Sequence, residues 1–163
     1  MRSTPTILAL VVLSLALRPD RALAEGDVAA PACVPTDLTL IDQLYDSAGN
    51  GYAFFGSSFG TFTVTCPVTL SNGNYKLNFS YANDTDGAGT DYYVKVEWKK
   101  RSRTTGAVSF VCSEFSSSSS TPCSSSSYAV DNVGYYYFVY VRLHRKATQA
   151  TSIRFNGLSF AEQ

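Results

Sequence analysis

Residues 135–145 read Tyr-Tyr-Tyr-Phe-Val-Tyr-Val-Arg-Leu-His-Arg, and this stretch indicates the fold class more strongly than any other part of the chain. The odd-numbered positions from 135 to 143 hold Tyr, Tyr, Val, Val and Leu, whereas the even-numbered positions hold Tyr136, Phe138, Tyr140, Arg142 and His144. A period of two in β-branched and aromatic residues predicts a β-strand. One face of such a strand should enter the core, which would place Tyr136, Phe138 and Tyr140 on the outside.

The same alternation recurs before and after this stretch. It predicts strands at residues 59–68, 75–82, 92–99, 107–112 and 152–160, and no segment shows a convincing amphipathic helix. About seven or eight short strands with frequent turns predict an all-β fold, an antiparallel β-sandwich. A jelly roll is the favoured topology, and an immunoglobulin-like order or a barrel is the alternative.

The N-terminal residues match an export signal. Arg2 is positively charged, residues 7–17 are apolar, and Ala22-Leu23-Ala24 has the small-x-small pattern of a cleavage site. We therefore expect a signal peptide at residues 1–24, an extended N-terminal segment at 25–36 and a single β-sandwich domain at 37–163. An uncleaved anchor is the alternative. No later stretch is long and apolar enough to span a bilayer, so the sequence predicts a secreted protein, either periplasmic or extracellular.

All four cysteines follow the expected cleavage site. An even number of cysteines in an exported chain predicts two disulfides, and four cysteines allow three pairings. The favoured pairing joins Cys33 to Cys66, which ties the N-terminal segment to a strand, and Cys112 to Cys123, which closes the Ser-rich segment 113–127. That segment is predicted to be a mobile surface loop, because it cannot bury enough apolar area to order itself. A four-cysteine zinc site is the alternative, but the chain contains no C-x-x-C spacing.

Two short stretches of the sequence and one cysteine carry a resemblance to other proteins. Residues 62–68 read Phe-Thr-Val-Thr-Cys-Pro-Val, Cys112 follows in a later strand, and residues 153–158 read Ile-Arg-Phe-Asn-Gly-Leu. This combination resembles a pattern in short exported bacterial proteins that are largely uncharacterised. The resemblance covers the mature chain and implies a disulfide-bearing β domain without implying any catalytic residues. The long Ser tract departs from the pattern.

The balance of charge argues against one class of partner. The chain has 13 Lys and Arg and 13 Asp and Glu, and removal of the expected signal peptide leaves 10 basic and 12 acidic residues. A nucleic-acid-binding domain is usually basic, so we expect no nucleic acid partner.

Basic residues cluster at 99–103 and at 142–146. Such clusters suit an anionic polymer, although charges at strand ends more often solubilise the strands and discourage edge pairing.

Residues 83–91 read Asn-Asp-Thr-Asp-Gly-Ala-Gly-Thr-Asp. Calcium binds about six to eight oxygen ligands, and Asp84, Asp86 and Asp91 offer carboxylates, so calcium is the one candidate cofactor. The loop departs from the EF-hand pattern, because Ala82 and Tyr93 occupy positions where carboxylates belong. A plain Asp/Gly hairpin turn accounts for the same residues and is the favoured interpretation.

Aromatic residues make up 13% of the chain and suggest a second kind of site. Aromatic rings stack on the apolar faces of sugar rings, and β-sandwiches often present such rings on a sheet. The candidate stacking residues are Tyr52, Trp98, Tyr136 and Tyr140. One alternative is a sheet buried on both sides, in which each tyrosine hydroxyl reaches a partner at the rim, and another is a protein interface.

These features favour a secreted, non-catalytic binding module whose partner is a carbohydrate or another cell-envelope polymer. The second hypothesis is a structural subunit that self-assembles into an oligomer, such as a surface layer, filament or coat. The third is a carboxylate glycoside hydrolase that uses Glu97 with Asp91 or Asp46. A Ser–His–Asp enzyme is disfavoured, because His144 is the one histidine and no G-x-S-x-G elbow is present.

Overall fold

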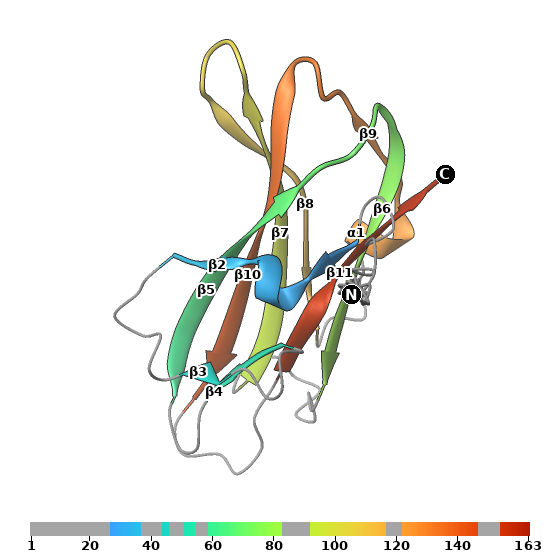
Figure 1. The fold of residues 1–163 in the computed structure, drawn as a ribbon. Helices are drawn as coiled ribbons and strands as arrows, with labels where there is room; N and C mark the ends of the chain where they lie inside the picture. The colour runs from blue at the N-terminus through green and yellow to red at the C-terminus, as the bar shows by residue number, and fades with distance from the viewer. Residues whose placement is uncertain are drawn as a thin grey trace, which may run out of the picture.

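The computed structural model describes residues 27–36, 44–45, 51–54, 59–82, 92–116, 122–146 and 154–163. These residues form two antiparallel sheets that pack as a β-sandwich (Figure 1). Helical structure in this part of the chain is limited to the short elements η1 (Ala30–Ala32) and α1 (Pro122–Ser125). The predictions of an all-β fold and of an antiparallel sandwich are therefore confirmed.

The longest strands lie where the alternation is clearest. β10 spans Tyr135–Arg145, as the sequence predicts. β7 continues past its predicted end to Ser102, because its ladder with β10 extends to the pair Ser102 and Tyr135. The other strands are β1 (Val28–Ala29), β2 (Val34–Pro35), β3 (Leu44–Tyr45), β4 (Tyr52–Phe54), β5 (Gly60–Val68), β6 (Gly73–Ala82), β7 (Tyr92–Ser102), β8 (Val108–Phe115), β9 (Tyr128–Val130) and β11 (Arg154–Glu162).

The strand order identifies a jelly roll. One sheet has the order β3-β4-β11-β6-β9, with β1 also paired to β11, and the other has the order β2-β5-β10-β7-β8. The strands from β4 to β11 pair like a long hairpin that has been rolled up: β4 with β11, β5 with β10, β6 with β9 and β7 with β8. This nested pairing is that of a jelly roll, so the favoured topology is confirmed over an immunoglobulin-like order or a barrel.

Alternate side chains of the central strands fill the space between the two sheets. The inward positions of β10 are buried from Tyr137 through Leu143, and they belong to one continuous core with Phe155 and Phe160 of β11. Burial of each large apolar side chain contributes about 1.5–3 kcal/mol. Because these side chains point inward, the residues between them on β10 must face outward.

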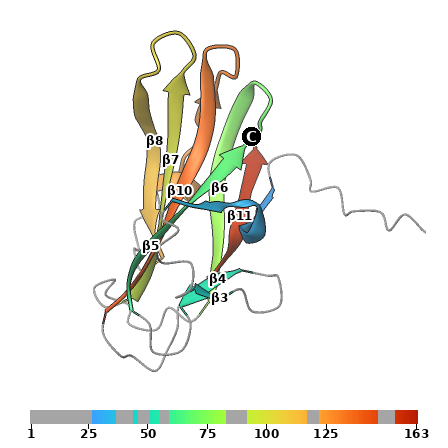
Figure 2. The same ribbon diagram turned by 60° about the vertical axis from the view of Figure 1, so that its left-hand side comes forward.

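A short N-terminal segment bridges the two sheets. β1 pairs with β11 in one sheet, β2 pairs with β5 in the other, and the segment that joins them crosses the side of the sandwich (Figure 2). A disulfide between Cys33 and Cys66 fastens this bridge to β5, and a second disulfide joins Cys112 of β8 to Cys123 of α1. Both predicted pairings are confirmed. Each disulfide restricts the unfolded chain, which typically stabilises the fold by about 2–4 kcal/mol.

β1 approaches the backbone of β11 closely at Gly157. This glycine has a φ of +155°, and a Cβ atom at its position would lie 2.9 Å from the carbonyl oxygen of Val28. The register of β11 against β6 shifts between Phe155 and Gly157. Gly157 therefore allows β1 to join the sheet at a point where a side chain would clash.

The Ser-rich segment differs from the predicted loop at both ends. β8 continues to Phe115 because its pairing with β7 continues, and Pro122–Ser125 form α1, with Cys123 fully buried. Main-chain pairing and the disulfide supply order there that the serine side chains could not supply. The prediction of a loop over all of residues 113–127 is therefore wrong at these ends, whereas residues 117–121 lie outside the described residues.

Candidate functional site

The outer face of the five-stranded sheet carries the aromatic residues that the sequence placed outside. Tyr136 exposes 55% of its surface, and Phe138 and Tyr140 are half-buried. The register sets their neighbours across the sheet, since Phe138 lies opposite Pro67 of β5 and opposite Lys99 of β7. The three rings therefore stand in a row on the middle strand of a hydrogen-bonded sheet, and their positions are set by the fold.

These three rings line a hollow of about 700 Å³. It crosses the sheet from Val34 on the edge strand β2 to Val108 on the edge strand β8, and both valines are exposed. Its volume lies in the range of small-ligand sites, about 300–1,000 Å³. The other lining residues are Thr65, Pro67, Arg101 and Tyr137.

Basic side chains stand against the rings of this face. The Cζ atom of Arg103 lies 3.6 Å from the centre of the Tyr136 ring. The Nζ atom of Lys99 lies 4.4 Å from the centre of the Tyr140 ring and 4.6 Å from that of Phe110. Each such cation–π contact contributes about 0.5–1 kcal/mol at an exposed site. The face is therefore aromatic and positively charged at the same time.

Glu97 is the one carboxylate among the described outward-facing residues of this sheet. Its Oε1 lies 2.6 Å from Nζ of Lys95 and its Oε2 lies 2.9 Å from Nζ of Lys99. Burial alone would raise the pKa of Glu97, but the hydrogen bonds and charges of the two lysines outweigh burial and hold the pKa below its ordinary value. A carboxylate that is kept ionised in this way is a poor proton donor, so Glu97 does not fit the acid of a glycoside hydrolase.

Trp98 contributes nothing to this face. It is fully buried, and its ring packs against Tyr128, Tyr137 and Phe160 with centroid distances of 6.0, 6.0 and 5.0 Å. The prediction of a stacking platform at Trp98 is wrong, because this residue shares its strand face with the two inward valines of β7. A buried indole ring leaves no surface on which a ligand could stack.

Tyr52 lies in the other sheet, on β4. Its hydroxyl group donates a 2.9 Å hydrogen bond to the carbonyl oxygen of Cys33, and its ring centre lies 6.1 Å from that of Phe62. Tyr52 thus links the N-terminal bridge to the core. The structure brings Tyr136 and Tyr140 together in one hollow and does not bring Tyr52 to it.

Two other predicted features have different outcomes. The candidate calcium ligands Asp84, Asp86 and Asp91 lie outside the described residues, so calcium stays a prediction. Within the described ranges, no three His, Cys, Asp or Glu side chains are grouped to hold a metal ion. The His144 ring stacks on Tyr93 at a centroid distance of 5.0 Å.

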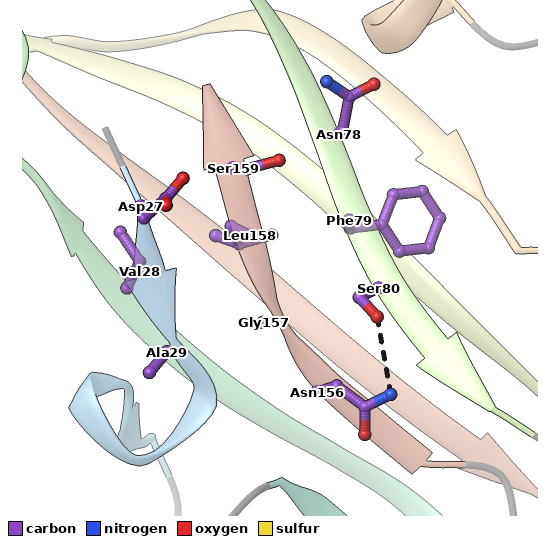
Figure 3. A pocket seen from close by; sticks show the side chains of 10 residues that line it. All are labelled: Asp27, Val28, Ala29, Asn78, Phe79, Ser80, Asn156, Gly157, Leu158 and Ser159. Atoms are coloured by element: carbon purple, nitrogen blue, oxygen red, sulfur yellow. Dashed lines mark hydrogen bonds between the residues drawn. The ribbon is translucent and has the colours of Figure 1, made fainter. Parts of the chain in front are cut away.

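A second hollow, of about 450 Å³, lies on the outer face of the six-stranded sheet (Figure 3). Polar side chains surround it, including Asn78, Ser159 and Asn156, whose Nδ2 donates a 3.4 Å hydrogen bond to Oγ of Ser80. The one aromatic residue that lines it, Phe79, packs against the core. This hollow therefore lacks the exposed ring that distinguishes the first one.

Sequence reasoning missed part of the first hollow. Val34 and Pro67 enter it only because β2, β5 and β10 pair in a particular register, which no local pattern reveals. The sequence shows Lys99, Arg101 and Arg103 as a basic cluster but does not by itself link them to the aromatic face. Their alternate spacing is the signal that could have placed them there, because alternate residues of a strand share a face.

The chain shows the chemistry of an exported protein. Its two disulfides are typical of proteins in oxidising compartments. Among the residues that the structure describes, no helix has the length and apolar character needed to cross a membrane.

Comparisons with known proteins give structural neighbours only. No family model matches the chain, and no curated protein matches it. One similar solved structure is that of accessory secretory protein 1, 2 and 3 in Streptococcus pneumoniae, with 12% identity, a TM-score of 0.45 and coverage of 82% of this chain and 98% of that chain. Another is that of TmCBM61 in complex with β-1,4-galactotriose, with 13% identity, a TM-score of 0.35 and coverage of 81% and 83%. Because both TM-scores lie below 0.5, neither neighbour bears on the ligand of this chain.

Proposed function

We propose that this chain is an exported, non-catalytic binding module that binds a polysaccharide on the outer face of its five-stranded sheet. The observation that carries the proposal is the exposed ring of Tyr136, which stands with Phe138 and Tyr140 at the wall of a 700 Å³ hollow. An exposed aromatic cluster on a soluble domain usually marks an interaction site.

The geometry suits a sugar chain in particular. A sugar ring has a flat apolar face, which stacks on an aromatic ring, and a rim of hydroxyl groups, which need hydrogen-bonding partners. Tyr136 supplies a ring, whereas Arg101 and Thr65 supply polar groups within the same hollow. Because the rings stand on a paired strand, little conformational entropy is lost when they bind a ligand.

Retention on insoluble polysaccharides and cell-wall preparations tests the proposal. We expect the mature chain to be retained on at least one polymer and Tyr136→Ala to reduce retention at least tenfold, with a nearly unchanged melting temperature. Phe59→Ala is the matched control, because Phe59 exposes 57% of its surface but precedes β5 at the opposite end of β10. Retention that survives Tyr136→Ala, or that is lost equally in both variants, would overturn the proposed site. Running the assay with calcium and with a chelator tests the predicted metal ligands.

A second candidate function is a self-assembling structural subunit. β8 is the edge of its sheet in the described residues, and its side chains Val108 and Phe110 expose 55% and 62% of their surfaces. An exposed apolar edge strand invites pairing with another chain. Light scattering of the purified mature chain distinguishes the two functions: a strict monomer at high concentration excludes self-assembly, whereas growth that Phe110→Lys abolishes supports it.

A further inference from the structure

The outer face of the five-stranded sheet is much more basic than the rest of the chain. It carries Lys95, Lys99, Arg101, Arg103 and Arg142, which are five of the 10 basic residues that remain after the expected signal peptide is removed. The same mature chain has 12 acidic residues, so its net charge is negative while this face is positive. A positive face on a negatively charged domain favours an anionic ligand through its local field.

Much of this positive charge is not neutralised within the fold. Glu97 is paired with Lys95 and Lys99, which accounts for the one outward carboxylate of the sheet in the described residues. Arg101 donates from Nε to the carbonyl oxygen of Gly106, and Arg103 donates from Nε to that of Tyr135. Neither arginine has a carboxylate within ion-pair distance among the described residues. Their terminal amino groups therefore remain available for an anionic partner.

Cations and rings on this face are direct neighbours. Arg103 covers one side of the Tyr136 ring at 3.6 Å. Tyr136 lines both the hollow that Arg101 lines and a smaller one, of about 420 Å³, that Arg103 lines. A sugar that stacks beside Tyr136 therefore has an arginine close to its edge. A ligand whose anionic group is attached to the sugar ring itself can use both the aromatic ring and the arginine. A uronic acid meets this requirement, and its planar carboxylate matches the fork of a guanidinium group.

We propose that the ligand of this face is a polyuronate, a polysaccharide whose sugar rings carry carboxylates. This proposal deepens the proposed function and rests on it: the aromatic row would bind the sugar rings, and the arginines would select the charged sugar. Clustered cations of this kind are screened by salt, so binding should weaken as salt concentration rises.

Affinity measurements on one polymer in two charge states test this selectivity. Polygalacturonate and its methyl-esterified form have the same backbone, but only the former is charged. We expect the mature chain to bind polygalacturonate at least tenfold more tightly at low salt, and we expect the difference to shrink at high salt. Dextran sulfate and a single-stranded oligonucleotide are the control polyanions, and both should bind at least tenfold more weakly than polygalacturonate.

Three variants test the assignment of the residues. Arg101→Gln combined with Arg103→Gln should reduce affinity for polygalacturonate at least tenfold more than it reduces affinity for the esterified polymer, because only the charged polymer loses an ion pair. Lys76→Gln, which removes a positive charge from β6 in the other sheet, is the control and should leave both affinities unchanged. Glu97→Gln should raise affinity for polygalacturonate, because it frees two lysines from their carboxylate. The melting temperature of each variant separates loss of a contact from loss of the fold.

The outcomes separate this inference from the function on which it rests. Equal binding of the charged and esterified polymers, sensitive to Tyr136→Ala, would overturn the polyuronate inference and leave the polysaccharide-binding function in place. Binding of dextran sulfate or the oligonucleotide as tight as that of polygalacturonate would overturn the inference in favour of a general polyanion surface. An absence of binding to every polysaccharide would overturn both.

Discussion

The guanidinium carbon of Arg103 lies 3.6 Å from the centre of the Tyr136 ring, although Arg103 lies in the turn between β7 and β8 and Tyr136 lies in β10. The backbone N–H of Arg103 also donates a 2.9 Å hydrogen bond to the carbonyl oxygen of Gly134. These contacts fasten the turn between β7 and β8 to the turn before β10. The most exposed ring of the candidate site is therefore held from the side by a neighbouring hairpin.

This relationship predicts a measurable coupling between the two side chains. In a double-mutant cycle with Arg103→Gln and Tyr136→Ala, the free energies of unfolding should show an interaction of about 0.5–1 kcal/mol. Urea denaturation of the two single variants and the double variant measures it. Strictly additive effects would show that the cation and the ring contribute to stability independently.

Trp98 provides a second prediction because it is the one tryptophan and is fully buried. Polysaccharide binding should leave its fluorescence emission unchanged, whereas denaturant should shift the emission to longer wavelength. Trp98→Phe should lower the free energy of unfolding by about 0.5–3 kcal/mol while polymer affinity stays within twofold. Quenching of Trp98 by ligand would contradict a binding site on the outer face.

Glu97 and Glu114 should make stability depend on pH in opposite directions. The pKa of Glu97 is lowered in the folded state, because the two lysines outweigh the effect of burial. Its stabilising contribution is therefore present above its ordinary pKa of 4.5 and is lost as pH falls from there through the lowered value. Burial raises the pKa of Glu114, although hydrogen bonds from Ser124 and Cys123 oppose the shift. Its contribution is present below 4.5 and is lost as pH rises through the raised value.

Urea denaturation from about pH 3 to about pH 8 measures both effects. Glu97→Gln should flatten the acid side of the stability profile, and Glu114→Gln should flatten the region above pH 4.5. In the wild-type chain, the free energy of unfolding should therefore change with pH both below and above pH 4.5. Glu97→Gln should remove the lower slope, and Glu114→Gln should remove the upper one. A profile that neither variant changes would contradict the assignment.

The two disulfides should differ in their contribution to stability. Their sequence separations are 33 residues for Cys33–Cys66 and 11 residues for Cys112–Cys123. The loop-entropy relation gives contributions of about 3.8 and about 2.8 kcal/mol, respectively. Replacing each pair by alanines should thus cost about 1 kcal/mol more for the longer loop, as measured by thermal or urea unfolding. A greater loss from the shorter loop would indicate that the packing of Cys123 and α1 outweighs chain entropy.

Gly157 predicts the sensitivity of the N-terminal bridge. Gly157→Ala should destabilise the fold, because its φ of +155° disfavours a side chain and the new Cβ would lie 2.9 Å from the Val28 carbonyl oxygen. Local opening of β1 should accompany the loss, so the amide protons of Val28 and Ala29 should exchange faster than in the wild-type chain. Gly106→Ala is a suitable control, because Gly106 also has a positive φ but no atom within 4 Å of its Cβ position.

The sequence predicted the strands well and the site less well. Alternation on residues 135–145 was sufficient to place Tyr136 outside and Tyr137 inside, because a period of two leaves no other choice once one face is buried. The same rule places Trp98 inside, because Trp98 alternates in step with Val94 and Val96 on one face of its strand. Pro67 could not be predicted as a neighbour of Phe138, since that contact depends on pairing between strands that are distant in the chain.

The nested pairing of the jelly roll has a consequence for folding during synthesis. β11 is the last strand of the fold, yet it lies between β4 and β6 in the middle of its sheet. A nascent chain that has emerged only as far as β10 therefore has a gap at the centre of that sheet, and the sandwich cannot close. Folds that rely on such distant pairings form slowly. The architecture thus delays closure of the sandwich until β11 has been synthesised and can pair with β4 and β6.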